Sequence, residues 1–130
     1  MKEKIFEAFK ALGFELEEVE GFGYGFQYEG RSYLYMCSED DDDFLNIVIP
    51  AVLDIDDEND ICFYQLMDKI NAARKYIKAN RLGKSMWLSY ERELFGDEDL
   101  KKVLTRMILH LDACLRFLQK AMKNSEKEED

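Results

Sequence analysis

The sequence has few of the residue types that specialised sites need. It contains one histidine, one proline, one tryptophan and three cysteines among 130 residues. A nucleophilic mechanism would have to use His110, one helical turn before Cys114, whereas Cys–His pairs are normally assembled from distant segments. The three cysteines are widely spaced, so they provide no ligand pairs for structural zinc. We expect Cys37, Cys62 and Cys114 to be reduced, buried thiols in a cytoplasmic protein.

Long apolar runs and a positive charge balance are also missing. No apolar run approaches the roughly 20 residues that span a bilayer, and the N-terminus lacks the apolar stretch of a signal peptide. The formal net charge of −10 argues against nucleic acid or an anionic membrane as a partner, because both repel an acidic surface. The hydrophobic fraction of 47% suits one folded domain. We place this domain at residues 1–122 and expect a charged, disordered tail at 123–130.

The hydrophobic pattern predicts an α+β fold with three helices and an antiparallel five-stranded sheet, in the order α-β-β-β-α-β-β-α. Apolar residues spaced by three and four predict the helices, and alternating apolar residues predict the strands. Asp57 and Asp97 are the expected helix N-caps, and Pro50 is expected to end the third strand or to leave it at an edge. The first expected helix ends at Leu12, the second spans 57 to about 74, and the third spans 97 to about 122. The expected strands span 22–28, 31–37, 44–49, 75–82 and 85–94.

Two strands indicate how the sheet is packed. Aromatic residues alternate with glycines between Phe22 and Tyr28, which places the aromatics on one face and lets another backbone or a helix approach the other. The third strand is apolar on both faces, so the sheet needs cover on both, from helices or from a partner. Its two rows are Leu45, Ile47 and Ile49 on one face, and Phe44 and Val48 on the other.

The order of elements and five short segments together carry a family resemblance. The segments are Tyr28-Glu29-Gly30, Asp43-Phe44-Leu45, Ile49-Pro50, Lys69-Ile70-Asn71 and Met86-Trp87-Leu88-Ser89-Tyr90-Glu91. They resemble the type III secretion chaperone-like fold, in particular its bacterial YbjN-type branch of sensory transduction regulator proteins, over nearly the whole chain up to about Met122. The resemblance implies a non-enzymatic, often dimeric protein that binds protein segments through apolar patches on its sheet and helices.

The charges are segregated along the chain. Ten acids and no bases lie between Glu39 and Asp60, and six bases and no acids lie between Lys69 and Lys84. The basic run is either a solvated face or a docking site for an acidic protein segment, with Lys75 and Lys78 as candidate contacts.

The acidic loops are weak candidates for a metal or a hydrolytic site. The segment from Asp54 starts like a calcium loop, but Asn59 and Gln65 stand where that pattern needs glycine and glutamate. We therefore expect no metal and no cofactor, and we leave open a weak cation site at 40–43. A hydrolase that uses paired carboxylates such as Asp54 and Asp56 is the alternative function.

Two apolar features are candidate protein-binding surfaces. Trp87 is either a core residue or, if its strand face is the less buried one, a binding anchor. On the last helix, Leu109, Ala113 and Phe117 form a second apolar row beside the main stripe, as a protein contact would require. We therefore expect a chaperone-like or regulatory binding module that holds a protein segment or a second copy of itself. Its candidate binding residues are Trp87, Leu109, Phe117, Lys75 and Lys78.

Overall fold

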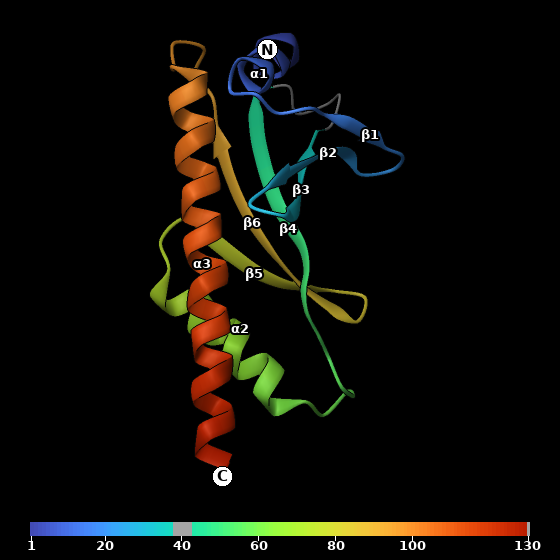
Figure 1. Ribbon diagram of the computed structural model, residues 1–130, viewed down its shortest axis with the longest axis vertical. Helices are drawn as coiled ribbons and strands as arrows, with labels where there is room; N and C mark the ends of the chain where they lie inside the picture. The colour runs from blue at the N-terminus through green and yellow to red at the C-terminus, as the bar shows by residue number, and fades with distance from the viewer. Residues whose placement is uncertain (38–42, 130) are drawn as a thin grey trace.

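The computed structural model describes residues 1–37 and 43–129, with side chains up to Asn124 in the last helix. Over these residues the chain forms an α+β fold with three helices and one antiparallel sheet (Figure 1). The sheet has six strands, so the expected number of five is wrong. The elements are α1 (Lys2–Ala11), β1 (Glu17–Val19), β2 (Gly23–Tyr28), β3 (Arg31–Met36), β4 (Phe44–Asp54), α2 (Ile61–Ala73), β5 (Ile77–Leu82), β6 (Ser85–Glu93) and α3 (Leu100–Glu129).

The unexpected strand is β1, at one end of the strand order β1-β2-β3-β4-β6-β5. It pairs with β2 through three residues, Glu17 with Gly25, Glu18 with Tyr24, and Val19 with Gly23. All three β1 residues are exposed. A short edge strand of this kind shows no alternation between apolar and polar residues, so its hydrophobic pattern could not reveal it.

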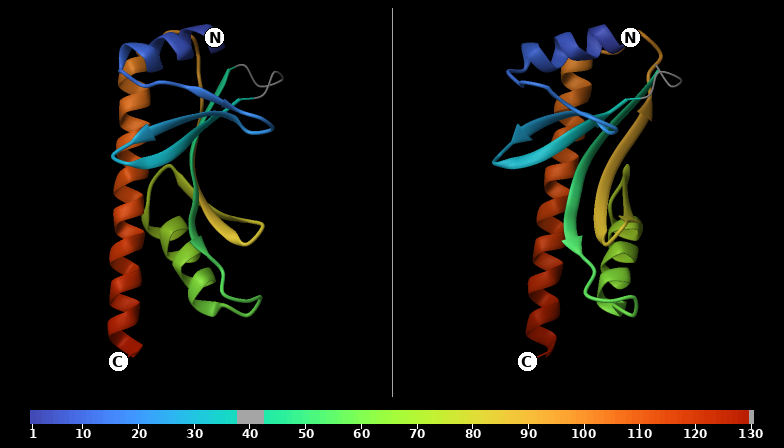
Figure 2. Two further views of the ribbon diagram at one scale, coloured as in Figure 1. Left: turned by 45° about the vertical axis from the view of Figure 1, so that its right-hand side comes forward. Right: turned by 90° about the vertical axis from the view of Figure 1, so that its right-hand side faces the viewer.

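The core lies between one face of the sheet and α3. This helix contacts β4, β5 and β6, and it also contacts α1 and α2 (Figure 2). The expected apolar stripe of the last helix is confirmed, since Leu104, Met107, Leu111, Leu115 and Leu118 are all buried. The strands contribute a matching layer of buried residues. It comprises Phe26, Tyr33, Tyr35, Leu45, Ile47, Ile49, Ile77, Ala79, Met86, Leu88 and Tyr90.

Strand β4 continues past Pro50, so the expected strand end at residue 49 is wrong, and of the two roles expected for the proline, ending the strand or standing at an edge, the structure supports the second. Its pairing with β6 shifts register between Ile49 and Leu53, which is a β-bulge, and Ala51 within the bulge has a φ of 50°. Pairing with β3 is recorded only as far as Val48. The proline therefore sits where no ladder hydrogen bond needs its missing N–H, and the strand survives it.

Helix α2 seals the edge of the sheet at β5. The side-chain amide of Asn71 donates to the carbonyl of Ala79 at 3.1 Å and accepts from the N–H of Ala79 at 2.8 Å. One side chain thus takes the place of a neighbouring strand at this residue. In the described part of the chain, α3 covers one sheet face and α2 lies along this edge, so the opposite face has no helix across it.

The helix starts and the tail differ from expectation. The N-cap of α2 is Asp60, which accepts from the N–H of Phe63 at 3.0 Å, whereas Asp57 accepts from Asn59 in the preceding turn. At the start of α3, Asp99 rather than Asp97 accepts a first-turn N–H. The expected disordered tail at 123–130 is helical as far as Glu129, and residue 130 lies outside the described residues.

Candidate functional site

Trp87 lies on the sheet face opposite α3. Alternation along β6 buries Met86, Leu88 and Tyr90 in the core, and directs Trp87 and Ser89 to the other face. The indole is half-buried rather than enclosed. Of the two interpretations of Trp87, the structure therefore supports the one that places it on the less buried face, where an aromatic ring is suited to anchor a partner.

Two neighbouring hollows lie on this open face. One hollow of about 460 Å³ lies beside Trp87, and a second of about 250 Å³ lies beside Phe22 and Phe44. The two hollows share Met36, Asn46 and Glu91, so they lie side by side on this face and are described together. We call the two hollows together the trough. Its apolar lining consists of Phe22, Met36, Phe44, Val48, Met67, Leu82 and Trp87.

Phe22 folds over the trough from the turn between β1 and β2. Its ring stacks on Trp87 at a centroid distance of 5.9 Å and an interplanar angle of 29°, although β3 and β4 separate their strands in the sheet. Phe22 was expected to share a face with Tyr24 and Phe26, and this prediction is wrong. Gly21 and Gly23 on either side of it have φ values of 84° and 133°, and such glycine conformations turn the ring to the open side.

Polar groups in the trough wall lack internal partners. The hydroxyl of Ser89 and the amide oxygen of Asn46 are buried and make no hydrogen bond within the described residues. Ser89 is only 8% exposed. A buried polar group without a partner costs about 1–3 kcal/mol. Hydrogen bonds from a bound partner to the Ser89 hydroxyl and the Asn46 amide oxygen would remove this cost.

The basic run does not form one free basic face. Lys78 pairs with Glu91 at 3.6 Å on the trough side. Arg81 pairs with Glu58 at 2.9 Å and donates to the hydroxyl of Tyr64 at 2.6 Å. Of the two candidate contacts, Lys75 is exposed ahead of β5, and Lys78 borders the trough. Two of the six bases are thus paired within the fold, and docking of an acidic segment by the run stays a prediction.

The second apolar row of the last helix is only partly exposed. Leu109 is 50% exposed, but Phe117 is half-buried and packs against the core. The amine of Lys69 and the guanidinium of Arg74 lie over the Phe117 ring, at 5.9 Å and 5.6 Å from its centroid. Phe117 therefore belongs to the contact between α2 and α3, and Leu109 is the exposed member of the row.

The residues of a nucleophilic site are poorly placed. Burial raises the pKa of the Cys114 thiol to about 11, which disfavours the thiolate that attacks a substrate. The ring of His110 instead packs edge-on against Tyr76 at 5.4 Å. Cys37 is half-buried and Cys62 is exposed, which corrects the expectation that all three thiols are buried.

The acidic loops show no converging ligand set over the residues that the structure covers. Asp54 accepts from the hydroxyl of Ser85, and Asp60 accepts from the N–H of Asp56 at 3.1 Å. These carboxylates thus accept hydrogen bonds from nearby polar groups of the fold. Of the cation site left open at 40–43, residues 40–42 lie outside the described residues.

Sequence comparison gives no relative from which a function could be transferred. Neither models of known protein families nor curated proteins match the chain. Within the described residues, no helix is long and apolar enough to cross a membrane.

Proposed function

We propose that this protein is a non-enzymatic binding module that holds an apolar segment of another protein in the trough. The observation that carries the proposal is a sheet face that no helix of the described residues covers, with stacked aromatic rings, Trp87 and Phe22, over an apolar floor. Tryptophan is among the residues enriched in the energetic centres of protein interfaces. Two methionines in the lining, Met36 and Met67, add side chains that adapt to different partners.

The segment binds by side-chain packing rather than by adding a strand to the sheet. Strand addition needs an open edge. The β5 edge is occupied at Ala79 by the Asn71 amide, and β1 at the other end has only three residues, two of them glutamates. The face of the sheet is therefore the better binding surface.

The charges around the trough indicate which class of protein segment it binds. Lys78 and Arg81, the bases at this side of the sheet, are already paired with Glu91 and Glu58, and the chain as a whole carries a net charge of −10. An acidic segment would be repelled, so the expected partner is apolar and neutral or basic. This binding mode agrees with the resemblance to YbjN-type and secretion-chaperone proteins, and the same proposal places the protein in the cytoplasm.

Selection of random peptides displayed on phage tests the proposal. We expect the wild type to enrich apolar, neutral or basic sequences, and we expect Trp87→Ala to lose them, since removing such an anchor costs about 2 kcal/mol or more, about 30-fold in affinity. Leu109→Ala, on α3 and away from the trough, is the matched control and should retain them. Equal enrichment by wild type and Trp87→Ala would contradict the proposal.

A second copy of the chain is the other possible occupant, and sedimentation distinguishes it. Two copies that each carry a charge of −10 repel one another, so we expect a monomer in the absence of a partner. A wild-type dimer that Trp87→Ala dissociates would assign the trough to self-association. A dimer lost in Leu109→Glu instead would assign the interface to α3.

A further inference from the structure

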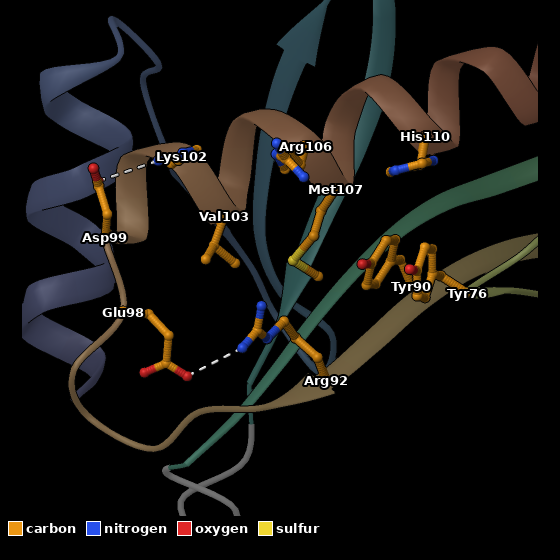
Figure 3. Close-up of a pocket in the computed structure, with 10 residues that line it drawn as sticks. All are labelled: Tyr76, Tyr90, Arg92, Glu98, Asp99, Lys102, Val103, Arg106, Met107 and His110. Carbon is orange, nitrogen blue, oxygen red and sulfur yellow. Dashed lines mark hydrogen bonds and ion pairs between the residues drawn. The ribbon is translucent and has the colours of Figure 1, made fainter.

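A second pocket, separate from the trough, lies between β6 and the first half of α3 (Figure 3). Its volume is about 460 Å³, which falls within the range of small-molecule sites. Met107 is buried and Val103 half-buried, and together they give it an apolar floor. We call it the α3 pocket. Its other lining residues are Tyr76, Tyr90, Arg92, Glu98, Asp99, Lys102, Arg106 and His110.

The α3 pocket has a net positive charge, because three cationic side chains (Arg92, Lys102 and Arg106) line it against two carboxylates (Glu98 and Asp99). Glu98 accepts from the N–H of Phe95 at 2.8 Å and from that of Gly96 at 2.8 Å, and it pairs with Arg92 at 3.1 Å. These N–H groups and the Arg92 charge lower the pKa of Glu98. The other acid, Asp99, accepts the backbone N–H of Lys102 at the helix start.

Two cationic side chains of α3 remain available. Lys102 and Arg106 are exposed, and their side chains make no hydrogen bond or ion pair that the structure records for the described residues. Burial raises the pKa of Tyr90, whereas the charges of Arg92 and Arg106 lower it, so both guanidinium groups act on the Tyr90 phenol. Tyr90, Arg92 and Arg106 all line the α3 pocket, and of the two guanidinium groups only that of Arg92 is paired within the described residues, with Glu98.

An aromatic wall stands beside these charges. The rings of Tyr76 and Tyr90 stack at 5.4 Å with an interplanar angle of 18°, and His110 meets Tyr76 edge-on. Tyr76 is 63% exposed and has a φ of 71°, a conformation that is unfavourable for a bulky side chain and concentrates at ligand-binding sites. The ring stabilises this bend through its contacts with Tyr90 and His110, and it still leaves more than half of its surface exposed beside the pocket.

We propose that the α3 pocket binds a small organic anion whose charge lies beside an aromatic ring. The anion pairs with Arg106 and Lys102, where charge-assisted hydrogen bonds are strong, and the ring packs against the wall formed by Tyr90 and Tyr76, beside the apolar floor. Nucleoside monophosphates and phenolic carboxylates share this chemistry. The chain as a whole has a net charge of −10 and repels anions. The positive charge of the α3 pocket attracts such a ligand to this one region.

Backbone amide chemical shifts in a titration of the ¹⁵N-labelled protein test the proposal. The probes are adenosine monophosphate and 4-hydroxybenzoate, with adenosine and inorganic phosphate as the separate halves of the first. We expect saturable shifts of the amides at 103–110 and 90–92 with at least one complete probe, and affinity at least about tenfold weaker for each half. If only one of the two complete probes saturates the shifts, that probe identifies the ligand class, a nucleoside monophosphate or a phenolic carboxylate.

Three variants assign the contacts. Arg106→Ala should weaken binding about tenfold or more and Arg106→Lys by less, since lysine keeps the charge but loses the planar pair of donors. Tyr76→Gly should weaken binding while the domain stays folded, because glycine accepts the positive φ and this relief offsets part of the loss of the stack on Tyr90. Arg116→Ala, which removes an exposed arginine of the same helix paired with Asp112, is the matched control and should bind like the wild type.

Three outcomes would overturn the proposal. One is the absence of saturable shifts in the α3 pocket with both complete probes. Another is equal affinity for inorganic phosphate and adenosine monophosphate, because the aromatic wall would then contribute nothing. The last is binding that Arg106→Ala and Tyr76→Gly leave unchanged.

Discussion

The seal between α2 and the β5 edge depends on one side chain, and its removal gives a quantitative test of the fold. Asn71 makes two hydrogen bonds to the backbone of Ala79, of 3.1 Å and 2.8 Å. Asn71→Ala removes both and leaves the buried face of α2 unchanged. The variant therefore isolates the contribution of the edge contact to the free energy of unfolding.

The expected loss follows from these two bonds. Each contributes about 0.5–1.5 kcal/mol net, so together they contribute about 1–3 kcal/mol. Alanine returns up to about 0.7 kcal/mol through its higher helix propensity. The net loss is then about 0.3–2.3 kcal/mol with a midpoint of about 1.3 kcal/mol, and the midpoint lowers Tm by about 4–7 °C in a domain of this size.

Thermal and urea denaturation followed by circular dichroism measure this loss. The matched control is Asn80→Ala, at the next residue of β5, where the exposed side chain makes no hydrogen bond that the structure records in its described part. This control should stay within about 0.5 kcal/mol of the wild type. An Asn71→Ala protein that melts within about 1 °C of the wild type would refute the account of the sealed edge.

Three further predictions concern the core, the loop before α3 and the acidic segments. Ile47→Asp should unfold the domain, because a buried, unpaired carboxylate at this fully enclosed position costs several kcal/mol, comparable with total stability; an unchanged Tm would show that the sheet register is wrong. The pKa of Glu98 in the folded state lies below its ordinary 4.5, chiefly because its carboxylate accepts a hydrogen bond from the Phe95 N–H. Glu98→Gln should therefore lower Tm at pH 7, and the Tm difference between wild type and variant should shrink as the pH falls below 4.5. A Tm difference that stays constant with pH would contradict this. Melts with a chelator and with millimolar calcium should agree within about 2 °C, and a rise of many degrees with calcium would instead reveal a cation site.

Local patterns predicted most of the fold correctly. The Glu29-Gly30 turn, with φ values of 51° and 74°, joins β2 to β3 as expected, since a two-residue hairpin turn with both φ positive matches the twist of the strands. The two faces of β4 and the main stripe of α3 also follow from period and spacing. These features depend on residues near one another in the sequence, where hydrophobic period is informative.

The errors arose where distant segments determine the local structure. Pro50 remains in a strand because β3 does not pair with it, and Phe22 crosses to the open face because two glycines turn the chain. For the site, spacing showed that Leu109 and Phe117 share one side of α3. It could not show that Lys69 and Arg74 of α2 lie over Phe117, because helical period identifies a row and not the element that covers it.

The emission of Trp87 during a peptide titration reports directly whether a partner segment occupies the trough. Trp87 is the only tryptophan in the chain, so all indole emission comes from the trough. With an apolar peptide obtained by display, the account predicts a saturable blue shift as the half-buried indole is enclosed. It also predicts that Met36→Ala weakens binding and that Leu109→Ala does not. A peptide that binds with unchanged emission, and with equal affinity for the wild type and Met36→Ala, would contradict the claim that the trough is the binding site.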